Sequence, residues 1–425
     1  MNTLAERDQA VIWHPFTQMQ TAPLPIPIVR GNGSVLYGAD GREYLDMVSS
    51  WWVNLHGHAH PYIAQRVSEQ LNTLEHVIFA GFTHQPAVEL AERLLKILPQ
   101  NQAKVFYSDN GSTAVEVALK MSFQYWHNLG KPRRKVVALE NAYHGDTFGA
   151  MAVGERNAFT APFVPFLFDV DYLPTPLTGQ ETDVLKLAET LFTDDVAAFI
   201  IEPLVQGAGG MIMYEPDVLD QLIQLARRNG ILIIADEVMT GFGRTGRLFA
   251  SDYLQQKPDL MCLSKGITGG TMALGVTTCT QAIYDVFLSD NKHKTLFHGH
   301  SFTANPLACA AALASMDLLL LPETQSNIQR IAEQHAQFAG RLANWANVSS
   351  IRQRGTLLAF DLKVGEQTSY FNSIRDVAYA FLLERGVLMR PLGNTLYLMP
   401  PYCTTNEQLL YSYQQVDELV NTIPF

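Results

Sequence analysis

Two polar residues, Lys265 and Asp236, each end an apolar run, and their side chains are the most reactive pair that the sequence suggests. Lys265 follows the apolar residues 260–263 and Ser264, and Asp236, 29 positions earlier, closes the run 231–235. This spacing suits one strand–connection–strand unit, with a carboxylate and an amine at equivalent ends of two buried strands. Pyridoxal phosphate catalysis needs both groups, because a lysine holds the aldehyde as a Schiff base and an acid pairs with the pyridinium nitrogen. Either residue alone is better explained as a polar residue where a strand meets solvent.

Three further loops follow predicted strands and supply groups that such a cofactor needs. Residues 109–113 pass from a strand into a helix, and Thr113 and Glu116 have the spacing of a capping box, so a helix N-terminus with free N–H groups is available to a phosphate. Helix capping alone explains the same residues. Residues 143–147 place Tyr143 where its ring can stack on a planar cofactor or simply pack under a loop. Glu202, after the apolar run 199–201, begins the third loop.

The bulk properties of the chain exclude several classes of function. Its 425 residues are 47% apolar, and the net charge of −11 is spread without acidic or basic blocks, which disfavours nucleic acid or an anionic membrane surface as a partner. The four cysteines form no C-x-x-C pair, so neither a disulfide framework nor a zinc site is indicated. No signal peptide or membrane-spanning run is apparent, and we expect a cytoplasmic protein.

The order of apolar patterns along the chain predicts an α/β fold. Residues 1 to about 30 carry several prolines and are predicted to lack regular helix, and residues 34–37 and 43–46 resemble a hairpin. A helical pattern begins near Pro86. Strands and helices then alternate over residues 104–107, 112–127, 135–139, 197–202, 217–228, 231–236 and 260–263. This alternation predicts a mostly parallel sheet with helices on its faces. We expect a large domain over residues 51–305 and a smaller domain built from residues 1–50 and 306–425.

Two other motifs suggest different chemistry. Residues 241–246 match the G-x-G-x-x-G pattern of dinucleotide-binding proteins, which would favour an NAD-dependent dehydrogenase. However, no long amphipathic helix follows, and the required acid does not close the next strand. His56, His58 and His60 would share one face of an extended strand and could bind a metal, but without further ligands nearby, solvated or capping histidines explain them better.

Two features outside the central loops suggest a substrate site. Trp51 and Trp52 are consecutive, and in an extended segment they would point opposite ways, so that one can face a cleft. Arg390 ends the apolar run 387–389, where a guanidinium suits a substrate carboxylate, although a structural salt bridge is the simpler explanation.

Taken together, these segments resemble the class III, fold type I, pyridoxal-phosphate aminotransferases over nearly the whole chain. The resemblance rests on short motifs: Trp13-His14-Pro15, Ser49-Ser50-Trp51-Trp52, Asp109-Asn110-Gly111-Ser112, Tyr143-His144-Gly145-Asp146-Thr147, Ile201-Glu202-Pro203, Ala235-Asp236-Glu237, the glycines of 241–246, Ser264-Lys265-Gly266, Thr268-Gly269-Gly270 and Arg390-Pro391. The tryptophan pair and the Trp-His-Pro motif are similar to the branch that serves biotin biosynthesis, in which an amino-oxo acid accepts an amino group. Another ω-amino-acid or diamine aminotransferase, with ornithine, 4-aminobutyrate or lysine as a substrate, is the alternative within the class.

The resemblance implies a role for each of these residues. Lys265 would form the Schiff base and carry the proton, Asp236 would pair with the ring nitrogen, and Tyr143 would stack on the ring. Gly111 and Ser112 would bind the phosphate, together with His300 and Ser301 from the neighbouring subunit of a homodimer. The remaining residues would bind the small-molecule substrates: Trp51, Gly299 and Arg390 the oxo acid, with Asp146 and Arg244 near an S-adenosylmethionine donor, and Trp52 and Phe16 elsewhere in the substrate site.

Two residues depart from the pattern of that branch. Phe16 stands where a tyrosine usually helps to position both substrates, so a hydrogen-bonding hydroxyl is missing and the identity of the donor stays open. Ser301 replaces a threonine and keeps its hydroxyl.

Overall fold

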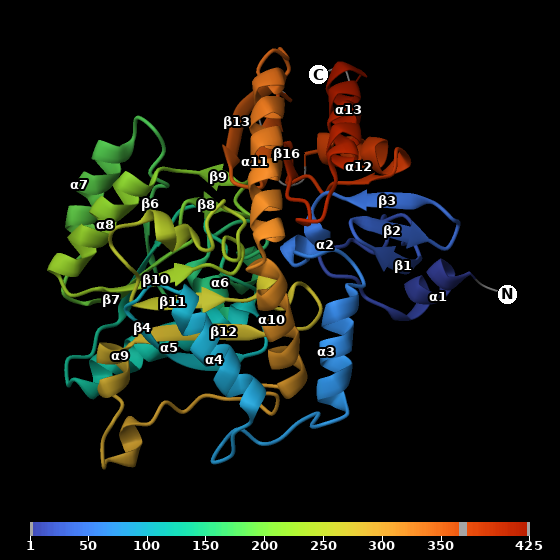
Figure 1. The fold of residues 1–425 in the computed structure, drawn as a ribbon. Helices are drawn as coiled ribbons and strands as arrows, with labels where there is room; N and C mark the ends of the chain where they lie inside the picture. Colours follow the sequence, from blue (N-terminus) through green and yellow to red (C-terminus); the bar gives the residue numbers. More distant parts are fainter. Residues whose placement is uncertain (1–2, 365–371, 423–425) are drawn as a thin grey trace.

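The computed structural model describes residues 3–364 and 372–422, which are built around a seven-stranded sheet (Figure 1). In their order across the sheet the strands are β4 (Gln102–Ser108), β12 (Gly275–Thr280), β11 (Leu260–Leu263), β10 (Leu232–Asp236), β7 (Val196–Ile201), β5 (Lys135–Leu139) and β6 (Asp171–Leu173). β12 runs antiparallel to both of its neighbours, β4 and β11, and the other neighbouring strands of this sheet are parallel. Every residue of β7 and β10 is buried, as continuous apolar runs in a parallel sheet require.

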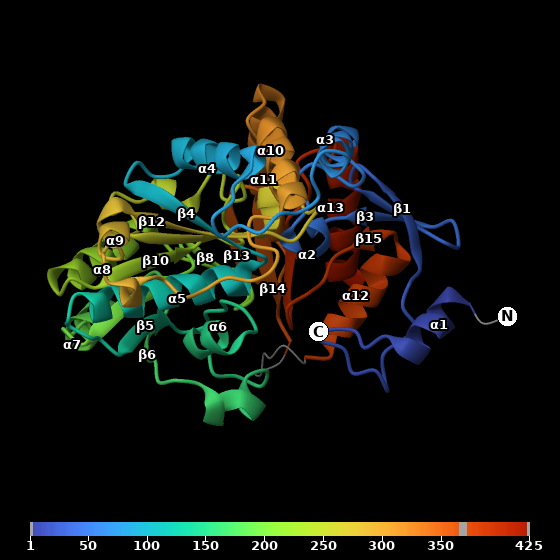
Figure 2. The same ribbon diagram turned by 90° about the horizontal axis from the view of Figure 1, so that it is seen from below.

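Helices cover both faces of this sheet (Figure 2). One face carries α5 (Gly111–Asn128) and α6 (Phe148–Val153), which pack on the side chains of Ile234 and Cys262. The opposite face carries α4 (Gln85–Ile97), α8 (Pro216–Arg228) and α10 (Pro306–Leu319), whose apolar residues pack against Ile233, Ala235 and Met261. Successive residues of a strand point to opposite faces, so the two layers are the direct result of the buried strand sequences.

Two smaller sheets join the ends of the chain. The first has the order β1 (Ile28–Asn32), β2 (Val35–Gly38), β3 (Glu43–Asp46) and β15 (Val387–Leu388), so that a C-terminal strand pairs in parallel with an N-terminal one. The second contains β13 (Val348–Arg354), β14 (Leu357–Leu362) and β16 (Thr395–Leu398), which pack with α11 (Pro322–Leu342) and α13 (Asn406–Thr422). The boundaries at residues 50 and 305 stay a prediction, and residues 1–2, 365–371 and 423–425 of the predicted small domain lie outside the described residues.

Shorter elements connect these layers. They are α1 (Leu4–Val11), α2 (Ser49–Trp52), α3 (Pro61–Leu71), η1 (Ala161–Phe166), α7 (Glu181–Leu191), β8 (Val205–Gln206), β9 (Ile212–Met213), η2 (Ala250–Tyr253), η3 (Lys265–Thr268), α9 (Gln281–Asp285), η4 (Lys292–Lys294) and α12 (Ile374–Glu384). Within the described residues no single helix is long and apolar enough to cross a membrane; α10 and α11, bent by 70° at their junction, meet that length and composition only as a pair.

The structure confirms the alternating strands and helices and the hairpin of β2 and β3. It corrects two predictions. Helix α1 forms within the segment predicted to lack helix, because Thr3 and Glu6 make a reciprocal capping box before the first proline of the segment. Helix α5 does begin at Gly111, but Asn110 and Thr113 form its capping box. Glu116 instead accepts hydrogen bonds from the backbone N–H groups of Gly149 and Ala150.

Candidate active site

A cavity of about 420 Å³ lies where the parallel strands of the large sheet end. Loops after five strands and one segment from the N-terminal region line it: Asp109–Ser112 after β4, Tyr143–Gly145 after β5, Glu202 after β7, Asp236, Val238 and Met239 after β10, Ser264 and Lys265 after β11, and Trp52 and Val53. The carboxyl ends of strands in an open α/β sheet are the usual place for a ligand. The three loops predicted from the sequence therefore meet Asp236 and Lys265 at one edge of the sheet.

Lys265 and Asp236 face this cavity from neighbouring strands. β10 and β11 are parallel, Asp236 lies opposite Cys262, and Lys265 follows β11 by two residues. The Lys265 side chain is partly buried, and desolvation lowers its pKa below the usual lysine value although Asp236 and Glu202 oppose that shift. Among the described residues its Nζ finds no hydrogen-bond acceptor, and it lies 4.6 Å from the centre of the Trp52 ring. An amine whose pKa is lowered gives up its proton more readily, which suits a nucleophile and base.

Asp236 is held by a histidine that the sequence analysis gave no role. One carboxylate oxygen accepts the Val238 N–H at 3.0 Å, and the other lies 2.7 Å from Nδ1 of His144. Since the carboxylate accepts, His144 donates from Nδ1. Its Nε2 is buried without a partner among the described residues. The pair fixes the direction of the carboxylate, and the remaining lone pairs of Asp236 are available to a protonated ring nitrogen.

The N-terminus of α5 and the loop after β5 approach each other closely. Gly145 has φ +130°, and a Cβ on it would lie 2.0 Å from Oγ of Ser112. A Cβ on Gly111 would lie 2.7 Å from a methyl group of Val238. Only glycine permits either approach, and Gly111, Ser112 and Gly145 all line the cavity. Helix α5 has 18 residues and begins with a glycine, so the free N–H groups at its N-terminus suit a phosphate group.

Tyr143 and Glu202 complete the polar wall. Tyr143 donates its backbone N–H to Glu202, whose other oxygen accepts the N–H of Gly207. Burial raises the pKa of Glu202 to about 7. Burial also raises the pKa of Tyr143, with a smaller contribution from the neighbouring Asp146. The tyrosine therefore stays a neutral ring, as the predicted stacking role needs. Glu202 was recognised in the sequence only as part of a polar loop.

The tryptophan pair divides between two environments. Trp52 lines the cavity and donates from Nε1 to the Tyr397 hydroxyl at 2.9 Å. Trp51 is 43% exposed and contacts Phe16, with ring centres 5.7 Å apart, and the Arg390 guanidinium, 4.9 Å from its ring centre. The two side chains do diverge, but the segment is a kinked short helix and not the extended strand that was predicted. Phe16, Trp51 and Arg390 thus form a second group of side chains. This group lies next to the cavity, because Trp51 is followed in the chain by Trp52, which lines it.

Other predicted site residues lie away from the cavity wall. Arg244 is buried, and its guanidinium donates to the backbone carbonyls of Asn54 and Pro400. Asp146 contacts the edge of the site, because its backbone N–H donates to Ser112. Gly299, His300 and Ser301 are not among the described residues that line the cavity of their own chain. Their predicted contribution to a neighbouring subunit stays a prediction.

The two alternative motifs take other conformations. The three histidines do not share a strand face: His56 contacts Ser315, His58 contacts Asp46, and His60 is the N-cap residue of α3. Residues 3–364 and 372–422 contain no group of three His, Cys, Asp or Glu side chains able to hold a metal ion. The glycines of 241–246 lie in turns that lead to the single 3₁₀ turn η2, without the helix that binds a dinucleotide.

Comparisons with known proteins agree with this geometry. The class-III aminotransferase family model matches residues 16–420. The adenosylmethionine-8-amino-7-oxononanoate aminotransferases of Synechococcus elongatus and Geobacter sulfurreducens are 52% and 41% identical, covering 97% and 99% of this chain and 99% and 98% of the relatives. The crystal structure of the enzyme of that name from Methanocaldococcus jannaschii superposes with a TM-score of 0.95 at 35% identity, covering 99% of both chains. A PLP-bound amine transaminase from an uncultivated Pseudomonas species superposes with a TM-score of 0.91 at 32% identity, covering 97% of this chain and 98% of that one.

Proposed function

The chain belongs to the class-III aminotransferases and has the fold of the type I pyridoxal-phosphate transaminases, and from this premise we propose that it aminates 8-amino-7-oxononanoate to 7,8-diaminononanoate, a step of biotin biosynthesis. The amino donor we propose is S-adenosylmethionine, as the names of the relatives state. We further propose that the enzyme works in the cytoplasm as a homodimer with pyridoxal 5′-phosphate as its cofactor.

The observation that carries the proposal is the partly buried Lys265 amine, which has no hydrogen-bond acceptor among the described residues and lines the same cavity as Asp236. The described residues fit the cofactor. Gly111 and Ser112 would hold its phosphate at the N-terminus of α5, and Asp236, directed by His144, would accept a hydrogen bond from its protonated ring nitrogen. Tyr143 would cover its ring.

When bound, pyridoxal phosphate supplies an electron sink for the negative charge that develops on the substrate carbon. The residues of the chain supply the proton transfers and the orientation. Lys265 Nζ, whose pKa is lowered by burial, can take the proton from the carbon that bears the donor's amino group and return it on the acceptor. Trp52 and Glu202 border this amine and limit the access of water.

The group of Phe16, Trp51 and Arg390 supports the choice of acceptor. The Arg390 guanidinium lies over Trp51, and an arginine beside an aromatic surface fits a carboxylate at the end of an apolar chain. The Phe16 ring has no hydroxyl to share with a donor, so the donor is the part of the proposal that most needs measurement. The alternative is a class-III aminotransferase that acts on another ω-amino acid or diamine. The similarity of this chain to an amine transaminase favours that alternative over a reaction other than transamination.

The loop that carries Gly299, His300 and Ser301 supports the homodimer. Its neighbours Phe297 and Phe302 are 69% and 62% exposed, and a partner subunit seated on this loop would cover these two large apolar side chains. In a dimer these side chains would be buried, and His300 and Ser301 would approach the phosphate site of the partner subunit.

The test begins with protein reconstituted with pyridoxal phosphate. We expect a visible absorption band, and borohydride reduction should fix the cofactor on the peptide that contains Lys265, detected by mass spectrometry. The reconstituted enzyme is then given 8-amino-7-oxononanoate with S-adenosylmethionine, lysine or glutamate in separate assays. S-adenosylmethionine should support the highest kcat/KM. A label on another lysine contradicts the assigned site, and failure of all three donors contradicts the assigned reaction.

A further inference from the structure

The segment that carries the two tryptophans is held in a strained backbone conformation. Ser49, Ser50 and Trp52 have φ values of 51°, 61° and 67°, in the left-handed region that side chains other than glycine rarely adopt. Helix α2 is consequently kinked at Ser50 and Trp51. Such strain persists only where surrounding contacts fix it, so the contacts that hold this segment determine where the tryptophans point.

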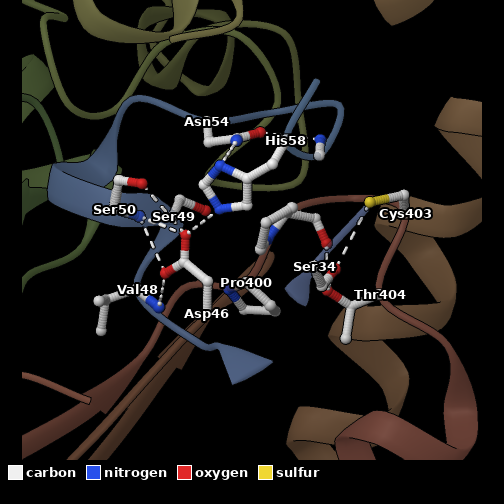
Figure 3. Close-up of polar contacts among 12 residues, drawn as sticks. Ser34, Asp46, Val48, Ser49, Ser50, Asn54, His58, Pro400, Cys403 and Thr404 are labelled. Carbon is white, nitrogen blue, oxygen red and sulfur yellow. Dashed lines mark hydrogen bonds and ion pairs between the residues drawn. The ribbon is translucent and has the colours of Figure 1, made fainter. Parts of the chain in front are cut away.

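Asp46 makes most of these contacts (Figure 3). Its carboxylate is fully buried and accepts the backbone N–H of Ser50 at 2.7 and 2.9 Å, the Ser50 hydroxyl at 3.2 Å and the N–H of Val48 at 3.3 Å. His58 Nε2 lies 2.9 Å from the same carboxylate. A carboxylate that accepts hydrogen bonds from several N–H groups of a turn stabilises that one backbone conformation, because each N–H group must point at the carboxylate.

The neighbours of His58 fix which of its nitrogens carries the proton. Asn54 Oδ1 accepts the N–H of Gly57 at 2.8 Å, so its NH₂ group is the end that faces Nδ1 of His58, at 3.2 Å. Nδ1 must therefore accept, and Nε2 donates to Asp46. Asn54, His58 and Asp46 thus form one directed chain of hydrogen bonds, which begins and ends on the segment that carries the tryptophans.

The segment that carries the tryptophans is in direct contact with the loop that follows Lys265. A Cβ on Gly270, in the loop after Lys265, would lie 3.0 Å from the backbone of Asn54, so the two backbones touch without space between them. Trp52 lies with its ring 4.6 Å from Lys265 Nζ, and Trp51 lies under Arg390. A shift of the segment would therefore move both tryptophans relative to the lysine amine and the guanidinium.

We propose that Asp46 and His58 are positioning residues for the transamination, because they hold the strained turn that sets Trp52 beside Lys265 and Trp51 beside Arg390. They touch neither the cavity nor the amine. Their effect is on the geometry in which the substrates meet Lys265, and a displacement of the order of 1 Å at a reacting group costs up to about 100-fold in rate. The inference rests on the proposed function for its kinetic readout, but its structural readout needs no substrate.

The experiment compares D46N, H58L and H58Q with the wild-type holoenzyme. D46N places an NH₂ group among N–H donors, and H58L removes the donor from the carboxylate, whereas the amide of H58Q can still donate to it. For D46N and H58L we expect kcat/KM to fall by about 10- to 100-fold, with a weaker near-UV circular dichroism signal from tryptophan. For H58Q we expect values within about threefold of wild type.

D259N is the matched control. Asp259 is a mostly buried carboxylate that accepts the backbone N–H of Ile233 at 2.8 Å and pairs with Arg227, at the opposite end of β10 and β11 from the cavity. The D259N substitution should lower Tm without changing the tryptophan circular dichroism signal or the kcat/KM. The proposal is overturned if D46N and H58L lower Tm as D259N does while their tryptophan signal and kcat/KM stay at wild-type values. An inactive wild type would contradict the proposed function, and the circular dichroism comparison would still decide the positioning role.

Discussion

Replacing Lys265 by methionine should abolish activity and at the same time stabilise the cofactor-free protein. The lysine amine is partly buried, its pKa is lowered by desolvation, and none of the described residues accepts a hydrogen bond from it. Methionine has nearly the same length and carries no charge, so K265M removes the desolvation cost of an ammonium and keeps the contact with the Trp52 ring. A residue required for chemistry is therefore expected to be unfavourable for folding.

The size of the effect follows from the burial of the amine. Replacing a buried ion pair by apolar groups of similar volume is neutral or stabilises by about 1–4 kcal/mol, and we take the same order for the single ammonium of Lys265. For a chain of 425 residues the unfolding entropy is roughly 0.9 kcal/mol per kelvin, so each kcal/mol corresponds to about 1 °C in Tm. We expect K265M to melt about 1–4 °C above the wild type near neutral pH.

The pH dependence identifies the cause. Because the pKa of Lys265 is lower in the folded chain than in the unfolded chain, the unfolded chain binds more protons, and folding becomes more favourable as the pH rises. The Tm of the wild type should therefore approach the Tm of K265M as the pH rises towards the ordinary lysine pKa of about 10.4. The difference in Tm between K265M and the wild type should be larger near neutral pH than at about pH 10.

The assay is thermal unfolding of cofactor-free protein at one scan rate, at about pH 7 and about pH 10. K135M serves as the control, since Lys135 is half exposed and pairs with Asp195 at 3.0 Å, and its loss should not stabilise the protein. The reasoning is refuted if K265M is less stable than the wild type at neutral pH, or if its advantage does not shrink as the pH rises.

Three further predictions test the site. D236N removes the negative charge that would keep the ring nitrogen protonated and should lower kcat by about 100-fold or more while the protein still binds pyridoxal phosphate, measured by turnover and absorbance. G145A, whose Cβ would lie 2.0 Å from the Ser112 hydroxyl, should weaken pyridoxal phosphate binding by at least about tenfold in a titration. G179A, at φ +89° in open space, should leave that affinity unchanged. F16Y should raise kcat/KM for S-adenosylmethionine by about 2- to 10-fold, the effect of one hydrogen bond, and an unchanged value would exclude this position from donor binding.

The sequence predicted the cofactor half of the site because local patterns encode it. Asp236 and Lys265 each close a buried apolar run, and parallel strands bring such closing residues to one edge, as the pairing of β10 and β11 confirms. The start of α5 at Gly111 was likewise visible from helix capping, although Asn110 and not Glu116 takes part in the cap. These features depend on residues within one strand–helix unit, so their spacing is readable without the tertiary structure.

The contacts that were missed join segments far apart in the chain. His144 and Asp236 are separated by 92 positions, and the role of the histidine depends on how two loops meet. Trp51 and Trp52 were expected to diverge by strand alternation, whereas they diverge through a turn with positive φ values that no residue type in Ser-Ser-Trp-Trp signals. Arg244 belongs to a glycine-rich motif, yet its guanidinium is buried among backbone carbonyls from two other parts of the chain.

The distribution of these contacts separates binding of the cofactor from recognition of the substrate. The groups that fit the cofactor lie on loops of the seven-stranded sheet, one face of which packs in a cluster that contains no residue from the chain ends. The tryptophan turn is held by Asp46 at the end of β3 and by the Met399 carbonyl, which accepts the Ser49 hydroxyl at 2.7 Å, so its geometry depends on both ends of the chain. Lys265 lies between the two, and its own φ of 45° places it in the left-handed region. Substitutions in the N-terminal and C-terminal segments should therefore change which substrates react, while the binding of the cofactor persists.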